Sequence, residues 1–192
     1  MQGAHIAVHD LACRRGDRVL FRGLSFALNA GEALQVTGTN GTGKSSLLRL
    51  VAGLARPFAG SVARHGAVGL VDERPALDPE LPLERALAFW RGLDGRTPVD
   101  LDALGLADLL DVPVRYLSTG QRKRAAMARL LGQRAEVWLL DEPLNGLDVH
   151  AAALVERLAA AHCREGGVLL IASHQPFALA GMREVALADF AP

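Results

Sequence analysis

The sequence predicts an α/β fold, and three segments carry this prediction. The apolar run Ala33–Thr37 has the length of a buried strand and leads directly into a glycine-rich loop. Behind that loop, Ser46–Ala52 has the spacing of a helix, and Gly53 supplies its stop signal. A second apolar run, Val137–Leu140, is also typical of a strand, and it ends in two carboxylates.

The glycine-rich loop has the spacing of a phosphate-binding loop. Its glycines let backbone N–H groups turn inward around phosphate oxygens, and the helix start adds a partial positive charge. Lys44 adds a full positive charge, and the Ser45 hydroxyl suits Mg²⁺. Because strand, loop and helix follow in the order that the motif requires, we expect a nucleotide site rather than an ordinary glycine turn. Its expected residues are Gly38, Thr39, Asn40, Gly41, Thr42, Gly43, Lys44, Ser45 and Ser46.

The two carboxylates at the end of the second strand have separate expected roles. Asp141 is positioned to hold Mg²⁺ through water, as the acid of this motif does in P-loop ATPases. Glu142 is a candidate general base that polarises an attacking water. The alternative is a solvated turn before Pro143, and the phosphate-binding loop upstream argues against it.

A capped helix start is expected between these two strands. Ser118 has the position of an N-cap before a strongly helix-forming stretch, and such a start is a second anion site. We expect the basic run Arg122–Arg124 to be a solvated face. In this order, after a phosphate-binding loop and before an Asp-Glu strand, the segment resembles the signature motif of ABC ATPases. The matching residues are Ser118, Thr119, Gly120 and Gln121.

Two further landmarks support the resemblance to ABC ATPases. Asn145–Asp148 occupies the place of the loop that meets the partner subunit, with Asp148 at its acidic end. Ile171–His174 is typical of a strand that ends at the switch histidine, which senses the γ-phosphate, although a lone histidine is more often structural. The resemblance covers nearly the whole chain and implies an ATPase that uses ATP and Mg²⁺. It implies Glu142, His174 and Lys44 as catalytic residues.

The resemblance also implies a domain organisation. We expect one ABC ATPase domain over residues 1–192, with a RecA-like core, an N-terminal antiparallel β subdomain and a small helical subdomain. Prolines punctuate residues 74–117, which we assign to the helical subdomain, and 1–73 and 118–192 form the nucleotide-binding core. Further strands are expected at His5–Leu11, Val19–Leu28, Gly66–Val71 and Gly167–Ala172, and helices at Glu84–Trp90, Leu101–Leu110 and Ala151–Ala161.

Composition excludes several classes of protein. The 192 residues suffice for one such domain, and the net charge of zero argues against broad electrostatic binding to nucleic acid. No apolar run approaches the roughly 20 residues of a membrane span, and the first residues lack the pattern of a signal peptide. Cys13 and Cys163 have neither metal-site spacing nor a haem-attachment motif, so we expect reduced thiols in the cytoplasm.

Four segments resemble the sequences of the ATP-binding subunits of cytochrome c maturation transporters. They are Val19–Phe26, Ser46–Pro57, Asp111–Arg115 and Ser173–Pro176. This resemblance implies a homodimer bound to integral membrane subunits at the cytoplasmic face of the inner membrane. Its hydrolysis would drive haem export, or release of a haem-loaded chaperone, without the ATPase binding haem or nucleic acid. The alternatives are another small ABC exporter, a soluble ABC ATPase of iron–sulfur assembly, and a nucleotide-gated interaction module with little turnover.

The sequence departs from the ABC pattern at three positions. Arg74 stands where a glutamine is expected, and Thr119 stands where glycine or alanine is usual. The aromatic residue that stacks on adenine is missing, and Arg15 lies closest to its place. Arg15 either lays its planar guanidinium over the base or is a solvated residue in a turn.

Overall fold

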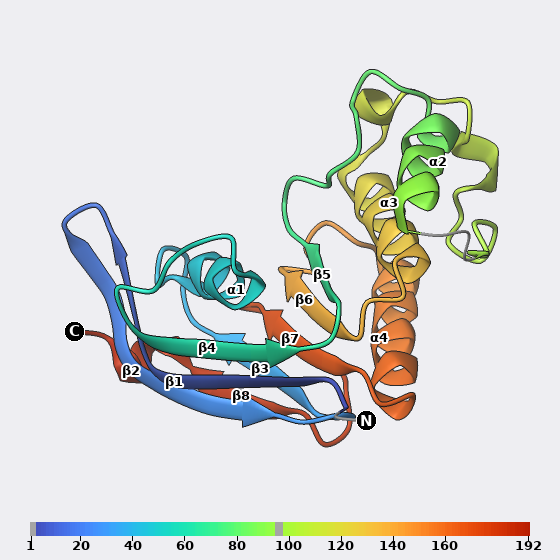
Figure 1. Ribbon diagram of the computed structural model, residues 1–192. Helices are drawn as coiled ribbons and strands as arrows, with labels where there is room; N and C mark the ends of the chain where they lie inside the picture. Colours follow the sequence, from blue (N-terminus) through green and yellow to red (C-terminus); the bar gives the residue numbers. More distant parts are fainter. Residues whose placement is uncertain (1–2, 95–97) are drawn as a thin grey trace.

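The computed structural model describes residues 3–94 and 98–192 and contains two β-sheets with helices around them (Figure 1). The strands are β1 (His5–Arg15), β2 (Arg18–Leu28), β3 (Ala33–Thr37), β4 (Ala59–His65), β5 (Val68–Val71), β6 (Val137–Asp141), β7 (Val168–Ala172) and β8 (Arg183–Ala186). The α-helices are α1 (Lys44–Ala52), α2 (Leu83–Asp94), α3 (Thr119–Gly132) and α4 (Val149–Arg164). Three short 3-10 helices cover Ala107–Leu109, Val114–Tyr116 and Leu187–Phe190.

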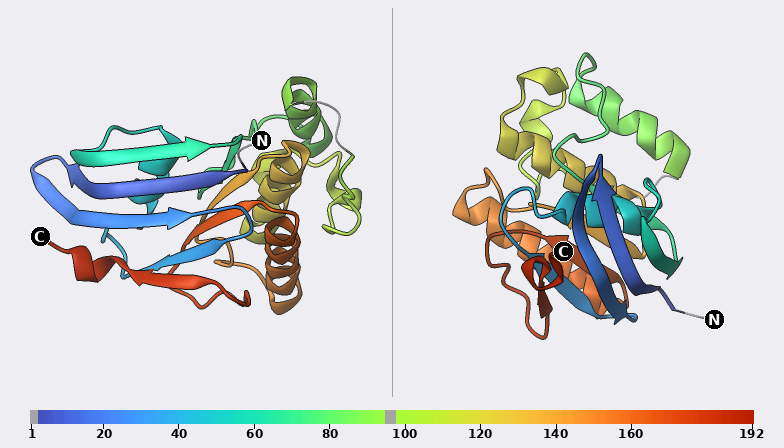
Figure 2. Two further views of the ribbon diagram at one scale, coloured as in Figure 1. Left: turned by 60° about the horizontal axis from the view of Figure 1, so that its bottom comes forward. Right: turned by 90° about the vertical axis from the view of Figure 1, so that its left-hand side faces the viewer.

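One sheet is antiparallel with the order β2-β1-β4, and the other is parallel with the order β5-β6-β7-β3-β8. Figure 2 shows the antiparallel sheet at one end of the molecule and helices α2 and α3 at the other. The predicted α/β architecture with an N-terminal antiparallel sheet is confirmed.

The inner strands of the parallel sheet are buried on both faces, which is why they are continuous apolar runs in the sequence. Val137 and Leu139 of β6 pack into a core shared with α1 and the antiparallel sheet. Trp138 and Leu140 point the other way, into a core shared with α3 and α4. This alternation fixes β6 between two helical layers, so the end of β6 has a defined position.

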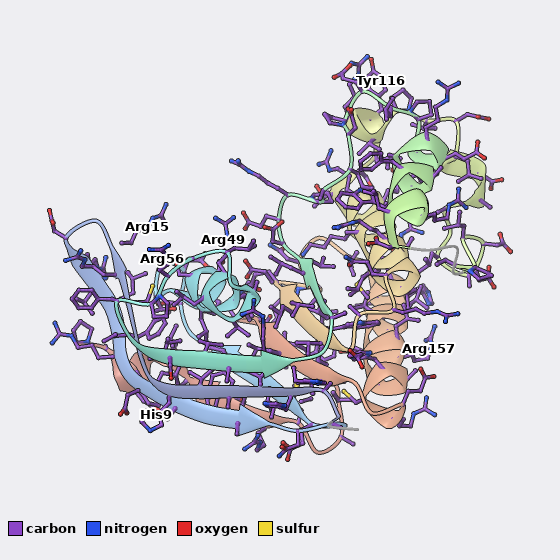
Figure 3. All side chains as sticks on the ribbon, viewed as in Figure 1. His9, Arg15, Arg49, Arg56, Tyr116 and Arg157 are labelled. Atoms are coloured by element: carbon purple, nitrogen blue, oxygen red, sulfur yellow. The ribbon has the colours of Figure 1, made fainter. Side chains whose placement is uncertain are left out.

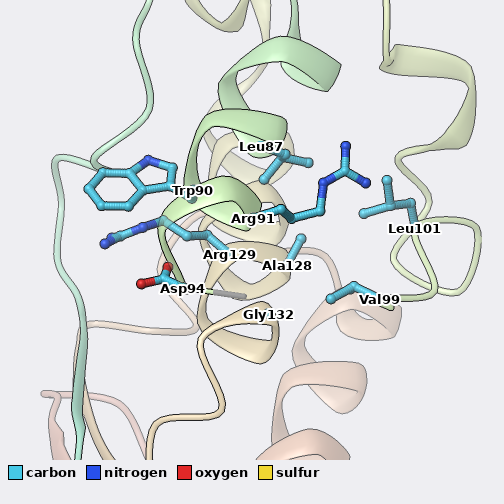
Figure 4. A pocket seen from close by; sticks show the side chains of 9 residues that line it. All are labelled: Leu87, Trp90, Arg91, Asp94, Val99, Leu101, Ala128, Arg129 and Gly132. Carbon is cyan, nitrogen blue, oxygen red and sulfur yellow. The ribbon is translucent and has the colours of Figure 1, made fainter. Parts of the chain in front are cut away.

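A third core holds the helical part of the chain together. It contains Leu83 and Leu87 of α2 and Ala125 of α3. Figure 4 shows the Arg129 side chain of α3 lying beside Trp90 of α2, and its guanidinium carbon is 3.6 Å from the ring centroid. Helix α3 contributes to this core and also to the core on the parallel sheet, so it joins the helical part to the rest of the molecule.

The predicted helix at Leu101–Leu110 is wrong. The structure has turns there, followed only by the 3-10 helix Ala107–Leu109. Gly105 adopts the left-handed conformation with φ 60°, and Arg124 Nη1 of α3 donates to its main-chain oxygen at 3.1 Å. The apolar spacing correctly indicates burial, because Leu104 and Leu106 are buried. The left-handed Gly105 nevertheless interrupts the helical backbone, and the contact from Arg124 stabilises this conformation.

Two strands were not predicted, and several bounds differ. Strand β4 is almost entirely exposed and lacks an apolar pattern, while β8 is a short partner of β3. The predicted strand His5–Leu11 extends to Arg15, because its pairing with β2 continues into the hairpin.

Candidate functional site

The phosphate-binding loop joins the carboxyl end of β3 to the first residue of α1. Gly38 has φ 151° and Gly43 has φ 110°, a region that residues with side chains rarely adopt. A Cβ on Gly38 would lie 2.8 Å from Thr42 Oγ1, and one on Gly43 would lie 3.2 Å from the Phe21 ring. The loop therefore requires glycine at both positions in order to close around a phosphate group.

Lys44 is held inside this loop. Its side chain is 6% exposed, and Nζ donates to the main-chain oxygens of Gly38 at 2.7 Å and Thr39 at 3.3 Å. The same atom lies 3.4 Å from Glu142 Oε1. Because a buried ammonium group needs acceptors around it, Lys44 links the phosphate-binding loop to the carboxylate that follows β6.

A cavity of about 420 Å³ opens beside the loop. Its lining residues come from distant parts of the sequence: Arg15, Arg18, Leu20, Asn40, Gly41, Gly43, Lys44, Ser45, Ser46, Glu73 and Glu142. Figure 3 shows Arg15, Arg49 and Arg56 on the same side of the molecule as α1. The structure thus brings Arg15, which is exposed, to the predicted nucleotide site.

Asp141, the last residue of β6, is 4% exposed. Burial raises the pKa of its carboxyl above the ordinary value, and a hydrogen bond from Ser45 offsets part of this rise. Its Oδ1 has no hydrogen-bond partner among the described residues. A buried carboxylate oxygen without a donor, beside a hydroxyl group, suits a cation that prefers oxygen ligands. The residues present therefore fit Mg²⁺, whose charge would favour the ionised carboxylate.

Glu142 follows in the left-handed conformation with φ 46°, which costs a non-glycine residue about 1–2 kcal/mol. Its Oε2 accepts hydrogen bonds from Ser173 Oγ at 3.2 Å and from His174 Nδ1 at 2.9 Å. Because an ionised carboxylate can only accept, Nδ1 of this histidine carries the proton. Burial alone would raise the pKa of Glu142, but the contacts with His174 and Lys44 outweigh it, so the pKa is lowered. The carboxylate is therefore ionised, as a general base must be.

The signature segment forms the first turn of α3. Ser118 Oγ accepts from the Gln121 N–H at 3.2 Å, and Gln121 Oε1 accepts from the Ser118 N–H at 2.7 Å. This reciprocal capping confirms the predicted N-cap. Thr119 lines a second cavity of about 200 Å³, which also reaches Glu142. No residue of Ser118–Gln121 lines the cavity beside the phosphate-binding loop, although the two cavities share Glu73 and Glu142. The two predicted anion sites are therefore distinct within one chain.

The expectation that Arg122–Arg124 forms a solvated basic face is wrong. All three side chains are half-buried, and each donates to a main-chain oxygen. Arg122 bonds to the main-chain oxygen of Leu117, just before α3 begins. Lys123 reaches the oxygen of Glu142, on the loop after β6. Burial outweighs the attraction of nearby carboxylates and lowers the pKa of the Lys123 ammonium.

Asp148 and Arg74 both lie in loops, and only Arg74 lines a cavity of the site. Asp148 is the N-cap of α4, and its Oδ1 accepts from the Ala151 N–H at 2.8 Å. Arg74 is exposed, and its main-chain N–H donates to Asp72 Oδ1 at 2.9 Å. It lines a cavity of about 530 Å³ that also contains Asp141. Arg74 therefore lies on the side of the site where the metal would bind.

Comparison with known proteins assigns the family. A model of the ABC transporter family matches residues 21–145. The chain is 57% identical to the cytochrome c biogenesis ATP-binding export protein CcmA of Novosphingobium aromaticivorans over 194 residues, covering 100% of both chains. The chain belongs to the CcmA family of ABC transporter proteins. The CcmA protein of Zymomonas mobilis is 49% identical over 97% of this chain and 86% of its own length. As an ABC ATPase, the chain binds and hydrolyses ATP, and the predicted family and activity are confirmed.

Solved structures share the fold of this ABC ATPase. A chain described as a metal-chelate type ABC transporter in an inward-facing conformation has a TM-score of 0.79 at 26% identity, covering 96% of this chain and 80% of that one. An ABC transporter ATP-binding protein from Pyrococcus furiosus has a TM-score of 0.81 at 21% identity, covering 98% and 100%. The predicted ABC-type fold is confirmed. None of the helices within the described residues combines the length and apolar character of a membrane span.

Sequence reasoning missed two residues at the site of this ABC ATPase. Ser173, next to the predicted switch histidine, is 1% exposed and bonds the Glu142 carboxylate. Lys123 bonds the main-chain oxygen of the same residue. A signal for Lys123 was present, because the chain has only two lysines among its 21 basic residues and the other is Lys44.

We expect Lys44→Ala and His174→Ala to affect different steps. Lys44→Ala removes a charged donor at the centre of the loop, so ATP affinity should fall about tenfold or more. His174→Ala removes a half-exposed partner of Glu142, so ATP affinity should change by less than about threefold while turnover falls at least about tenfold. Calorimetric ATP binding and phosphate release measure the two effects. Equal losses of affinity in both variants would show that the two residues do not have separate roles.

Proposed function

We propose that this chain is the ATP-hydrolysing subunit of a membrane ABC transporter complex in cytochrome c biogenesis. The observation that carries this proposal is the 57% identity to a CcmA protein over the full length of both chains. In this role it is a peripheral protein at the cytoplasmic face of the inner membrane, bound to integral membrane subunits. Its hydrolysis drives haem export or release of a haem-loaded chaperone. The ATPase contacts neither haem nor nucleic acid directly.

The geometry supports a separate role for each of the site residues. The phosphate-binding loop and Lys44 hold the β- and γ-phosphates of ATP. Ser45 and, through water, Asp141 hold Mg²⁺, which when bound neutralises charge on the phosphate oxygens. The ionised Glu142 orients and polarises the attacking water. His174 bonds Glu142, and its ring is half-exposed; in the proposed mechanism this ring contacts the γ-phosphate.

The separation of the two anion sites supports a head-to-tail homodimer. Thr119 of the signature segment and the phosphate-binding loop line different cavities of one chain. A two-fold axis that places the signature segment of each chain over the ATP of its partner completes both sites at once. Asp148, at the N-terminus of α4, lies in the loop that meets the partner. Arg15 covers the adenine of the nucleotide held by its own chain, which its place in the cavity wall supports.

Glu142→Gln should stabilise the ATP-bound dimer. The amide keeps the size of the side chain but cannot activate water, so ATP persists between the two subunits. Light scattering with saturating ATP and Mg²⁺ should show twice the monomer mass for this variant. Glu165→Gln, at an exposed glutamate beyond α4, is the matched control and should behave as the unsubstituted protein. A Glu142→Gln protein that stays monomeric with its membrane partner present contradicts the dimer.

The cellular role is tested by complementation. In a bacterium lacking its own ATPase of this kind, the chain should restore haem-stained c-type cytochromes, whereas Lys44→Ala should not. Restoration that does not depend on Lys44 would overturn the role of ATP hydrolysis. An active ATPase that co-purifies with membrane subunits but restores no cytochrome would favour another small exporter. One that leaves the membrane fraction and restores iron–sulfur enzymes would favour the soluble alternative.

Arg74→Ala should separate basal hydrolysis from coupling to the membrane subunits. A guanidinium can neither ligate a metal nor accept a hydrogen bond, and it is repelled by Mg²⁺ at short range. We therefore infer that the guanidinium takes no part in hydrolysis and that the loop carrying Arg74 serves the membrane partner. Basal ATPase activity should change by less than about threefold, while stimulation by the membrane subunits weakens. Arg74→Gln, the residue usual in the family, is the matched control. A large loss of basal turnover with coupling preserved would place Arg74 among the catalytic residues.

A further inference from the structure

Lys123 connects the signature helix to the main chain of Glu142 in the same chain. It lies in the second turn of α3, and its Nζ donates to the main-chain oxygen of Glu142. Its two basic neighbours bond elsewhere, Arg122 to Leu117 and Arg124 to Leu104 and Gly105. Of these three residues, Lys123 is the one that bonds Glu142.

The peptide group that Lys123 contacts belongs to a residue in an unfavourable conformation. Glu142 is one of three non-glycine residues with positive φ in the described part of the chain. Such a conformation persists only where the surroundings over-determine it. The Glu142 N–H donates to the Ala172 oxygen at 2.8 Å, and its own oxygen accepts from the Asn145 N–H at 3.2 Å and from Lys123.

The backbone conformation of Glu142 determines where its carboxylate points, because φ and ψ set the direction of the Cα–Cβ bond. In the left-handed conformation Oε2 meets Ser173 and His174, and Oε1 faces Lys44. A relaxed backbone would turn the carboxylate away from all three. Among the hydrogen bonds that the described residues make to the Glu142 main chain, the one from Lys123 is the only one that comes from a side chain, and its donor is charged.

We propose that Lys123 is a positioning residue for hydrolysis, which holds the Glu142 main chain so that its carboxylate meets the attacking water. The proposal rests on the catalytic role assigned to Glu142. It also explains why a lysine stands between two arginines at position 123. The space around the Glu142 carbonyl is half-buried, so a single ammonium group on a flexible stem fits it more easily than a planar guanidinium. Because Lys123 and the signature segment lie on one helix, a movement of that segment also moves the Lys123 ammonium that bonds the Glu142 main chain.

The test separates catalysis from binding and from stability. Lys123→Met keeps the stem and removes the charged donor, so kcat should fall about tenfold to a hundredfold while the KM for ATP changes by less than about threefold. Lys123→Arg restores a charged donor and should recover part of kcat. Arg124→Met is the control on the next residue, and it should lower the melting temperature without the loss of kcat. If Lys123→Met does not fold, Lys123→Gln serves, with a smaller loss of kcat expected.

A double-mutant cycle distinguishes positioning from a general structural effect. In the Glu142→Gln background, Lys123→Met should cause no further loss of residual hydrolysis, because its effect acts through the carboxylate. An unchanged kcat in Lys123→Met, or an equal loss in both backgrounds, overturns the proposal. If the Glu142→Gln single variant hydrolyses ATP at the wild-type rate, the catalytic role of Glu142 is overturned instead. Failure of the Lys123 proposal and failure of the role of Glu142 are therefore distinguishable.

Discussion

The position of the Glu142 carboxylate is the constraint on which the site depends. This group is buried, ionised and attached to a left-handed residue, and each property alone is unfavourable. The strand order makes the combination stable. Strands β6, β7 and β3 are neighbours in the parallel sheet, so their carboxyl ends deliver Glu142, His174 and Lys44 to one edge. A sheet with another strand order would leave the carboxylate without its partners.

Helix α3 extends this constraint beyond the sheet. Its buried residues are divided between the core on β6 and the core of the helical part, so it cannot move independently of either. The Arg129–Trp90 stack fixes its last turns against α2. Its first turn carries Ser118–Gln121, and the next turn touches Glu142 through Lys123. Helix α3 therefore carries the signature segment, which is assigned to the partner's nucleotide, and at the same time bonds the catalytic Glu142 of its own chain.

The sequence predicts the parts of the site that depend on short spacings. The glycine loop, the Asp141-Glu142 pair and the Ser118 cap were predictable because each needs particular residue types within a few positions. Lys123 was assigned to a solvated face because its partner lies 19 residues away and a charge run says nothing of long-range contacts. The apolar spacing of Leu101–Leu110 correctly predicted burial at Leu104 and Leu106, but the break at Gly105 depends on Arg124 of another element. Strand β4 has no apolar pattern, since it is mostly exposed.

The sheet order has a consequence for synthesis of the protein. Within the described part of the chain, strand β3, which carries the phosphate-binding loop, pairs with β7 and β8, and both lie beyond residue 167. The antiparallel sheet, in contrast, is complete by His65. Because domains emerge from the ribosome N-terminus first, the antiparallel sheet can form while translation continues, but the strand beneath the ATP site gains its partners only when β7 and β8 have been made. The ATP site, which is built on β3, therefore takes shape only after residues 168–186 have been synthesised.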